Sequence, residues 1–187
     1  MKPVIPEHVA SERLVIRCPS LEDSAEIYKA TQESMNELIP WMPWAKRSLT
    51  PEDTEESVRQ AIAKFVTRED LRYHFHHKET GKLLVCSGLH RIDWSLPKFE
   101  IGYWCRTSEQ GKGYVTEGVR ALTEMAFGRL GAARVEIRCD DLNMKSAAIP
   151  ERLGFSLEGI LKHDSRSPRG ELRSTRIYAL TDFTTLK

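Results

Sequence analysis

The feature that most limits how this chain can fold is a strand that runs directly into a glycine-bearing loop and then into a helix. Residues 99–105 are predicted to form a strand, and Gln110-Gly111-Lys112-Gly113 follows soon after. Helical spacing of apolar residues then begins at Val115 and stops at Gly131. Such a junction gathers unpaired backbone amides at the positive end of a helix dipole. With a lysine beside them, these amides predict an anion site suited to a pyrophosphate.

Two common phosphate-binding loops do not fit this junction. The Walker pattern GxxxxGK[ST] is absent, because Gly81-Lys82 is followed by Leu83, which offers no hydroxyl to a magnesium ion. The dinucleotide fingerprint GxGxxG fails because Thr116 occupies the place of the third glycine. A loop that wraps a diphosphate without metal or dinucleotide remains. On these residues alone, a plain strand-to-helix turn explains the sequence about as well.

The other elements predict a single mixed α+β domain over residues 1–187. We expect strands over 13–18, 72–77, 82–89, 99–105, 135–139, 155–161 and 172–180, and helices over 20–36, 50–66, 115–130 and 143–153. Ser20 and Thr50 each begin a helix with an acid three residues later. Pro150 is expected to kink or shorten the last helix, and a polar loop is expected over 163–171.

Composition excludes several classes of protein. Lys plus Arg number 28 and Asp plus Glu 27, so the formal net charge is +1, which argues against a general nucleic-acid coat protein. Residues 1–11 lack the apolar core of a signal peptide, and no apolar run is long enough to span a membrane. We therefore expect a cytoplasmic protein with no nucleic-acid or membrane partner.

Cysteine and histidine spacing gives no sign of a metal centre. Four cysteines lie far apart without a CxxC pair, so we expect reduced thiols packed in strands; they are Cys18, Cys86, Cys105 and Cys139. His74 and His76 share one face of a strand, with His77 beside them, but no third ligand is evident. No metal site is predicted.

Two longer runs resemble a known family. The run from Glu100 to Gly118, E-I-G-Y-W-C-R-T-S-E-Q-G-K-G-Y-V-T-E-G, resembles the central motif of GNAT acetyltransferases, which bind acetyl-coenzyme A through a Q/R-x-x-G-x-G/A loop. Gln110, Gly113 and Val115 fall on that pattern, although Val115 replaces the usual small residue. The run from Cys139 to Phe155 resembles the second half of the same site. Both runs look most like the RimJ/RimL type, which acetylates protein N-termini, including those of ribosomal proteins.

This resemblance implies a GNAT fold, in which a twisted mixed sheet is splayed in the middle and carries helices on both faces. It implies acetyl-coenzyme A as the acetyl donor, with the pantetheine arm between the splayed strands. We expect a cationic, amide-rich pocket over residues 106–113. The resemblance places the following residues against the cofactor: Tyr103, Trp104, Cys105, Arg106, Gln110, Gly111, Lys112, Gly113, Tyr114, Val115, Thr116, Asn143 and Ser146.

The same resemblance suggests catalytic residues. Attack of an amine on a thioester needs a neutral amine, a polarised carbonyl and a proton for the leaving thiolate. Glu100 matches a strand position from which some GNAT enzymes supply a general base, and His90 and His74 are alternatives, since histidine titrates near neutral pH. Ser146 matches the serine that acts as general acid in the RimL type. The backbone amide near Cys105 is expected to bind the carbonyl oxygen.

Three further points stay open at this stage. The acid expected in the late loop of RimL-type enzymes falls on Ser165, beside Asp164, so the role of that position is undecided. Catalysis by the Cys105 thiol is a weaker alternative, because direct transfer needs no thiol. Aromatic rings in the early loop and in the turns suit the acceptor side of the site, and we assign Trp41, Trp44, His90 and Trp94 to it.

The predicted reaction is direct acetyl transfer to a primary amine in a ternary complex. The N-terminal α-amine of a protein is the preferred acceptor. The alternatives are a small amine such as a polyamine, amino acid or aminoglycoside, or a non-catalytic acyl-coenzyme A-binding module. A monomer and a homodimer are equally compatible with the sequence.

Overall fold

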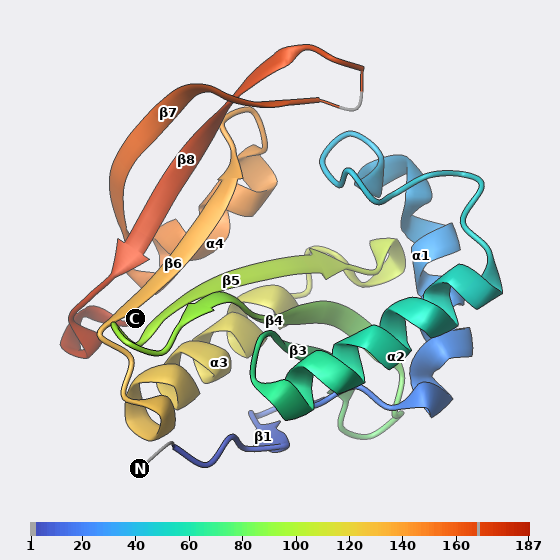
Figure 1. Cartoon of the computed structure of the whole chain (residues 1–187), viewed down its shortest axis with the longest axis horizontal. Helices are drawn as coiled ribbons and strands as arrows, with labels where there is room; N and C mark the ends of the chain where they lie inside the picture. The colour runs from blue at the N-terminus through green and yellow to red at the C-terminus, as the bar shows by residue number, and fades with distance from the viewer. Residues whose placement is uncertain (1–2, 168) are drawn as a thin grey trace.

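One eight-stranded mixed sheet runs through the computed structural model, which describes residues 3–167 and 169–187 (Figure 1). The strand order is β1-β2-β3-β4-β5-β6-β8-β7, and only β5 and β6 pair in parallel. The strands are β1 (His8–Ala10), β2 (Leu14–Arg17), β3 (Leu71–His77), β4 (Leu83–Asp93), β5 (Lys98–Cys105), β6 (Arg134–Asp140), β7 (Ser156–Arg166) and β8 (Leu172–Leu180).

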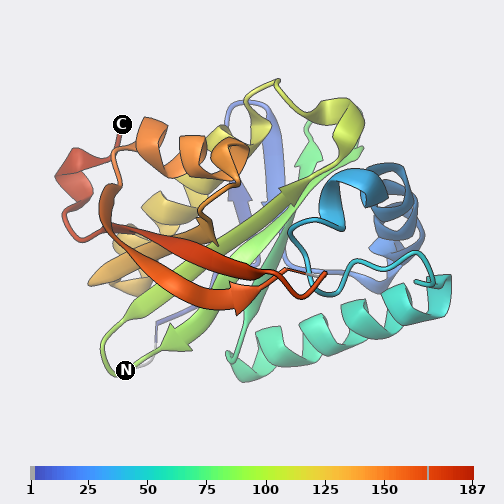
Figure 2. The ribbon, with the colours of Figure 1, turned by 90° about the horizontal axis from the view of Figure 1, so that it is seen from above.

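Helices cover both faces of this sheet, as predicted. Figure 2 shows α1 (Ser24–Leu38) and α2 (Pro51–Thr67) on one side and α3 (Tyr114–Leu130) and α4 (Met144–Leu153) on the other. The larger apolar core lies under α3 and α4, and the smaller one lies under α1 and α2 and includes Ile27, Val58 and Leu83. No helix in the described part of the chain is long and apolar enough to cross a membrane.

Local sequence signals act where they were expected. Thr50 begins α2 with a capping box in which Thr50 and Asp53 each bond the other's backbone amide. Gly131 and Gly154 end α3 and α4 in the left-handed conformation that glycine adopts without strain. All four cysteines are free thiols, as predicted.

The structure differs from the sequence expectations in three respects. The short strand β1 was not predicted. Strand β7 continues to Arg166, so residues 163–166 of the predicted polar loop belong to a strand; after a register shift between Leu161 and Ser165, Ser165 and Arg166 pair with β8 at an exposed edge. Helix α4 is not shortened by Pro150 and continues to Leu153.

The parallel ladder between β5 and β6 is short. Only Lys98, Phe99 and Glu100 of β5 have partners on β6, which are Arg134, Val135 and Glu136. Beyond these pairs β5 continues to Cys105 and β6 to Asp140, and the two strands diverge (Figure 1). This divergence confirms the predicted splay in the middle of the sheet.

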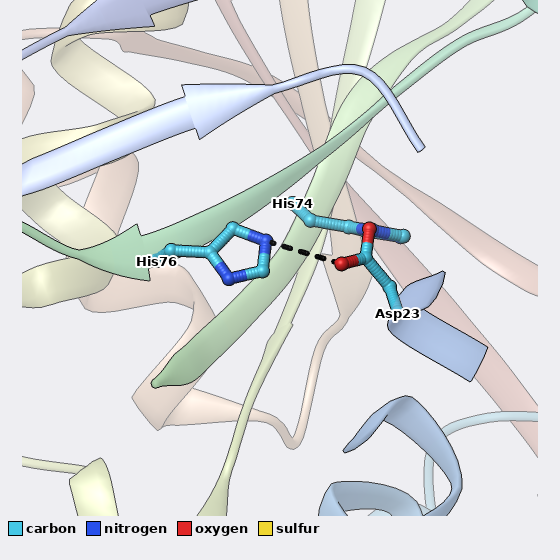
Figure 3. Close-up of side chains that lie close together, drawn as sticks. All are labelled: Asp23, His74 and His76. Atoms are coloured by element: carbon cyan, nitrogen blue, oxygen red, sulfur yellow. Dashed lines mark hydrogen bonds and ion pairs between the residues drawn. The ribbon is translucent and has the colours of Figure 1, made fainter. Parts of the chain in front are cut away.

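A buried carboxylate joins the start of α1 to the sheet (Figure 3). Asp23 ends the short 3-10 helix η1 (Leu21–Asp23) and lies against His74 and His76 of β3. Asp23 Oδ2 accepts hydrogen bonds from Arg17 at 2.9 Å and from the Ser20 amide at 3.1 Å, and it lies 3.2 Å from His74 Nδ1; Arg17 also bonds Oδ1. The sequence showed the histidines but not this third group, which folding brings to them and which Arg17 already neutralises.

Burial sets the protonation of this cluster. Desolvation lowers the pKa of both His74 and His76, so both rings are neutral at pH 7. Desolvation alone would raise the pKa of Asp23, but hydrogen bonds from His74 and Arg17 hold it far below its ordinary value. Among the described residues, no group hydrogen-bonds to Nε2 of either histidine.

Two glycines of α3 give a matched test of packing. A Cβ on Gly118 would lie 2.1 Å from Cε2 of Phe75, a fully buried ring, whereas a Cβ on Gly128 would meet nothing within 4 Å. We expect Gly118→Ala to lower the free energy of unfolding by about 1–3 kcal/mol through overpacking. Gly128→Ala should leave it unchanged or raise it by up to about 1 kcal/mol through helix propensity. Urea denaturation measures both, and equal effects of the two changes would contradict the packing seen here.

The histidines also predict how stability depends on pH. Their folded-state pKa values lie below those of the unfolded chain, so the unfolded state binds protons first as pH falls, and stability drops as pH decreases below about 6.5. Asp23 adds a second loss below about pH 4, because its folded pKa is also depressed. The free energy of unfolding, measured by urea denaturation at several pH values between 7.5 and 5, should fall less steeply with decreasing pH in His74→Gln than in the parent protein. The exposed His163→Gln is the control, and a slope unchanged in His74→Gln would refute the assignment.

Candidate active site

The gap between β5 and β6 exposes backbone groups of β5. The Arg106 amide donates to the Leu84 carbonyl of β4 at 2.9 Å. Amide directions alternate along a strand, so the Tyr103 and Cys105 amides point the other way, into the gap. An amide at that place can bind a carbonyl oxygen, which is the role that sequence analysis expected near Cys105.

One pair of side chains bridges the gap. The Tyr103 hydroxyl of β5 donates a 2.8 Å hydrogen bond to the backbone carbonyl of Ser146 in α4, and Ser146 Oγ lies 3.3 Å from the same hydroxyl. Asn143 is the N-cap of α4, with its side chain accepting from the Ser146 amide at 3.1 Å. Burial raises the pKa of the Tyr103 phenol, which keeps it protonated at neutral pH.

Pro150 explains why the Ser146 carbonyl is available to Tyr103. In an α-helix the amide of residue i bonds the carbonyl of residue i−4, and proline has no amide hydrogen. Pro150 sits four residues after Ser146, so this carbonyl has no donor from its own helix. The Tyr103 hydroxyl supplies the missing hydrogen bond from β5.

The loop before α3 has the geometry of an anion site. Gly111 and Gly113 adopt φ values of 75° and 84°, which turn the chain sharply into the helix. Within the described residues, no acceptor pairs with the amides of 111–116; the first bond of the helix runs from Glu117 to Gly113. Free amides at the start of a helix, together with the helix dipole, are suited to bind an anion, and the pyrophosphate site stays a prediction.

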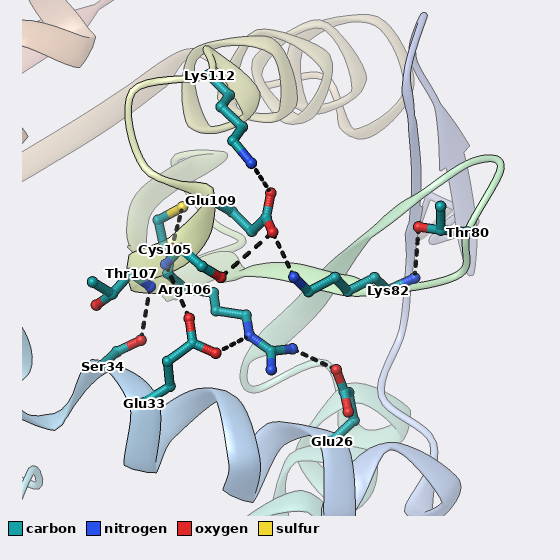
Figure 4. Close-up of polar contacts among 11 residues, drawn as sticks. Glu26, Glu33, Ser34, Thr80, Lys82, Cys105, Arg106, Thr107, Glu109 and Lys112 are labelled. Carbon is teal, nitrogen blue, oxygen red and sulfur yellow. Dashed lines mark hydrogen bonds and ion pairs between the residues drawn. The ribbon is translucent and has the colours of Figure 1, made fainter.

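The side chains around this loop are not cationic overall, which corrects one expectation. Figure 4 shows that the Arg106 guanidinium bonds Glu33 and Glu26 of α1, and that Lys82 and Lys112 both bond Glu109. Each cation therefore already has a carboxylate partner. The backbone amides are therefore the groups of this loop that remain free for an anion, and the ion pairs hold the loop against α1 and the start of β4.

Glu100 faces the opposite side of the sheet from the main core, where the parallel ladder stops. Its Oε2 lies 3.2 Å from Arg91 and 3.7 Å from Arg138. Together with Glu136, these side chains line a small cavity of about 70 Å³. The role of Glu100 as a base stays a prediction.

The predicted acceptor residues divide into separate places. Trp44 packs against Trp104, and Arg173 of β8 lies over the ring of Trp41 at 5.9 Å. Trp94 instead packs edge-on against Phe99 of the main core and donates to the Arg68 carbonyl, so it anchors the β4–β5 turn.

A groove lies where the segment after α1 meets the β7–β8 hairpin, whose tip reaches toward that segment in Figure 2. Its volume is about 250 Å³. The lining residues are Ile39, Pro40, Ser167, Arg169, Glu171 and Arg173. The sequence assigned Trp41 to the acceptor side but did not identify Arg173, because nothing local marks its position opposite Trp41.

The thiols near the site are poor nucleophiles. Burial raises the pKa of Cys105 and of Cys139 to about 11, so both stay protonated at neutral pH. The late-loop positions Asp164 and Ser165 lie exposed on β7.

Comparison with known proteins agrees with this geometry. Residues 13–156 match the acetyltransferase (GNAT) domain family. YdaF of Bacillus subtilis (strain 168), to which a ribosomal N-acetyltransferase activity is attributed, is 30% identical over 154 residues, 80% of this chain and 81% of YdaF. The ribosomal-protein-serine acetyltransferase of Escherichia coli (strain K12) is 28% identical over 152 residues, 81% of this chain and 84% of that protein.

Solved structures share the fold. The microcin C7 self-immunity acetyltransferase MccE, in complex with acetyl-coenzyme A and AMP, superposes with a TM-score of 0.85 at 25% identity over 91% of this chain and 93% of its own. The ribosomal L7/L12 α-N-protein acetyltransferase RimL, in complex with coenzyme A, gives 0.87 at 21% identity over 94% and 98%. The splayed sheet, the amide-lined loop and the match over most of the chain make this protein a member of the GNAT family of N-acetyltransferases, with acetyl-coenzyme A as the acetyl donor.

Proposed function

We propose that this enzyme acetylates the N-terminal α-amine of a protein, as the RimJ/RimL type does. The observation that carries the proposal is the groove between the segment after α1 and the β7–β8 hairpin. It is bordered by two surface segments and open to solvent, which suits an extended chain end. The attribution of ribosomal-protein substrates to YdaF and to the E. coli relative supports the same acceptor class.

The chain's own residues suit each part of the transfer. The amides of 111–116 would hold the pyrophosphate, and the Cys105 amide would polarise the thioester carbonyl. Ser146 would give its proton to the leaving thiolate, with Tyr103 fixing the turn that carries it. The amine forms its new bond to the carbonyl carbon as the carbon–sulfur bond breaks.

An acceptor panel tests the substrate class. Peptides with a free α-amine should release free coenzyme A thiol in the presence of acetyl-coenzyme A. The same peptides with a blocked N-terminus and an internal lysine should release at least tenfold less. Faster turnover of polyamines or aminoglycosides would overturn the protein-acceptor proposal. Turnover of no amine, despite a raised melting temperature with acetyl-coenzyme A, would assign a non-catalytic binding role.

Ser146→Ala tests the proposed acid. Loss of general-acid catalysis should lower kcat by about 10²–10⁴-fold, while the melting-temperature shift caused by acetyl-coenzyme A stays close to that of the parent. Ser156→Ala, an exposed serine at the start of β7, is the matched control and should keep full activity. An unchanged kcat, or loss of acetyl-coenzyme A binding, would show that Ser146 does not act as the acid.

A further inference from the structure

A histidine–carboxylate pair lies beside the point where the sheet opens. His90 of β4 stands directly opposite Glu100 of β5, the last β5 residue that pairs with β6. Its Nδ1 is 2.7 Å from Oδ2 of Asp70, the residue before β3. A carboxylate that accepts from Nδ1–H fixes the tautomer in which Nε2 carries a free lone pair.

Two paired glycines make room for this ring. Gly88 and Gly102 face each other across β4 and β5. A Cβ on Gly88 would lie 2.8 Å from Cε1 of His90, and a Cβ on Gly102 would lie 3.3 Å from Cδ2 and 3.6 Å from Nε2. The imidazole thus covers both glycines, with Nε2 on the β5 side. Side chains at these two positions would displace it.

The ring is also partly accessible to solvent. The His90 side chain is 29% exposed and that of Asp70 is 27% exposed. Both Gly102 and Glu100 lie on the face of β5 that carries Trp104, which packs against Trp44 of the acceptor side. No hydrogen bond to Nε2 of His90 is found among the described residues.

Glu100, the base suggested by the family resemblance, is placed differently. Its Oε2 is engaged by Arg91 and Arg138 together. The charged residues on the elements next to His90 are Asp70 ahead of β3, Arg72 on β3, Arg91 on β4, Glu100 on β5 and Arg138 on β6. Asp70 alone among them contacts the ring through a hydrogen bond.

We propose that His90 is the general base of acetyl transfer and that Asp70 is its positioning residue. This proposal rests on the proposed function. As the amine nitrogen bonds to the carbonyl carbon, its proton passes to Nε2 of His90, while the thiolate takes a proton from Ser146. His90 gains one proton and Ser146 loses one, so exchange with solvent restores both groups.

The test compares His90→Gln, Asp70→Asn and Glu100→Gln by the pH profile of kcat/KM, using any amine that the parent enzyme acetylates. His90→Gln should lose about 10²-fold or more at pH 7 and lose the acidic limb that belongs to the imidazole, keeping only the rise that follows deprotonation of the amine, so that activity recovers partly at high pH. Asp70→Asn should shift that limb and cost less. Glu100→Gln should keep the limb in place.

Binding of acetyl-coenzyme A, followed as a melting-temperature shift, controls for folding in each variant. If His90→Gln does not fold, Asp70→Asn still reports through its pH profile. Retention of the acidic limb in His90→Gln with its loss in Glu100→Gln would overturn the proposal and assign the base to Glu100. The pH profiles use whichever amine the parent enzyme acetylates. An error in the proposed acceptor class would therefore be detected by the peptide panel and would leave this test of the base unaffected.

Discussion

The site depends on one interruption of the sheet. Strands β5 and β6 share three residue pairs and then separate, which leaves backbone groups of both strands without ladder partners. Unpaired backbone groups away from water are costly, so such a gap persists only where other bonds hold both sides. Here β4 pairs with β5 as far as Cys105, and β8 pairs with β6 from Val135 to Asp140. The gap is therefore a fixed opening between two well-paired groups of strands.

Backbone groups are also the available ligands at the proposed pyrophosphate loop. Lys82 and Lys112 share Glu109, and Arg106 bonds both Glu26 and Glu33, so these three cations are already paired and recognition of an anion would fall to the backbone amides. This arrangement agrees with a net charge of +1 and with the lack of a basic stretch in the sequence. The ion pairs instead hold the loop in its conformation, since they fix it to α1 and the start of β4 before any ligand binds (Figure 4).

Local patterns in the sequence predicted most of the fold, because capping boxes, terminal glycines and alternating strands depend on near neighbours. Thr50 and Gly131 are examples. The family motifs pointed to the loop before α3 and to Ser146, whose roles stay predictions. The partners of the histidines could not be predicted: Asp23 is 51 residues from His74, and Asp70 is 20 residues from His90. Such pairs follow from the order of strands and from which face each residue occupies, and no sequence window contains that information.

Pro150 affects how α4 is held in position relative to the sheet. The carbonyl of Ser146 is tied to β5 through Tyr103 instead of to the next turn of its own helix. The position of the first turn of α4 is therefore fixed by β5, the strand that also carries the Cys105 amide. A small rotation of α4 against the sheet would be resisted at Ser146 more than at the far end of the helix. The serine hydroxyl and the amides of β5 are thus held at a fixed position relative to each other, although they come from opposite sides of the gap.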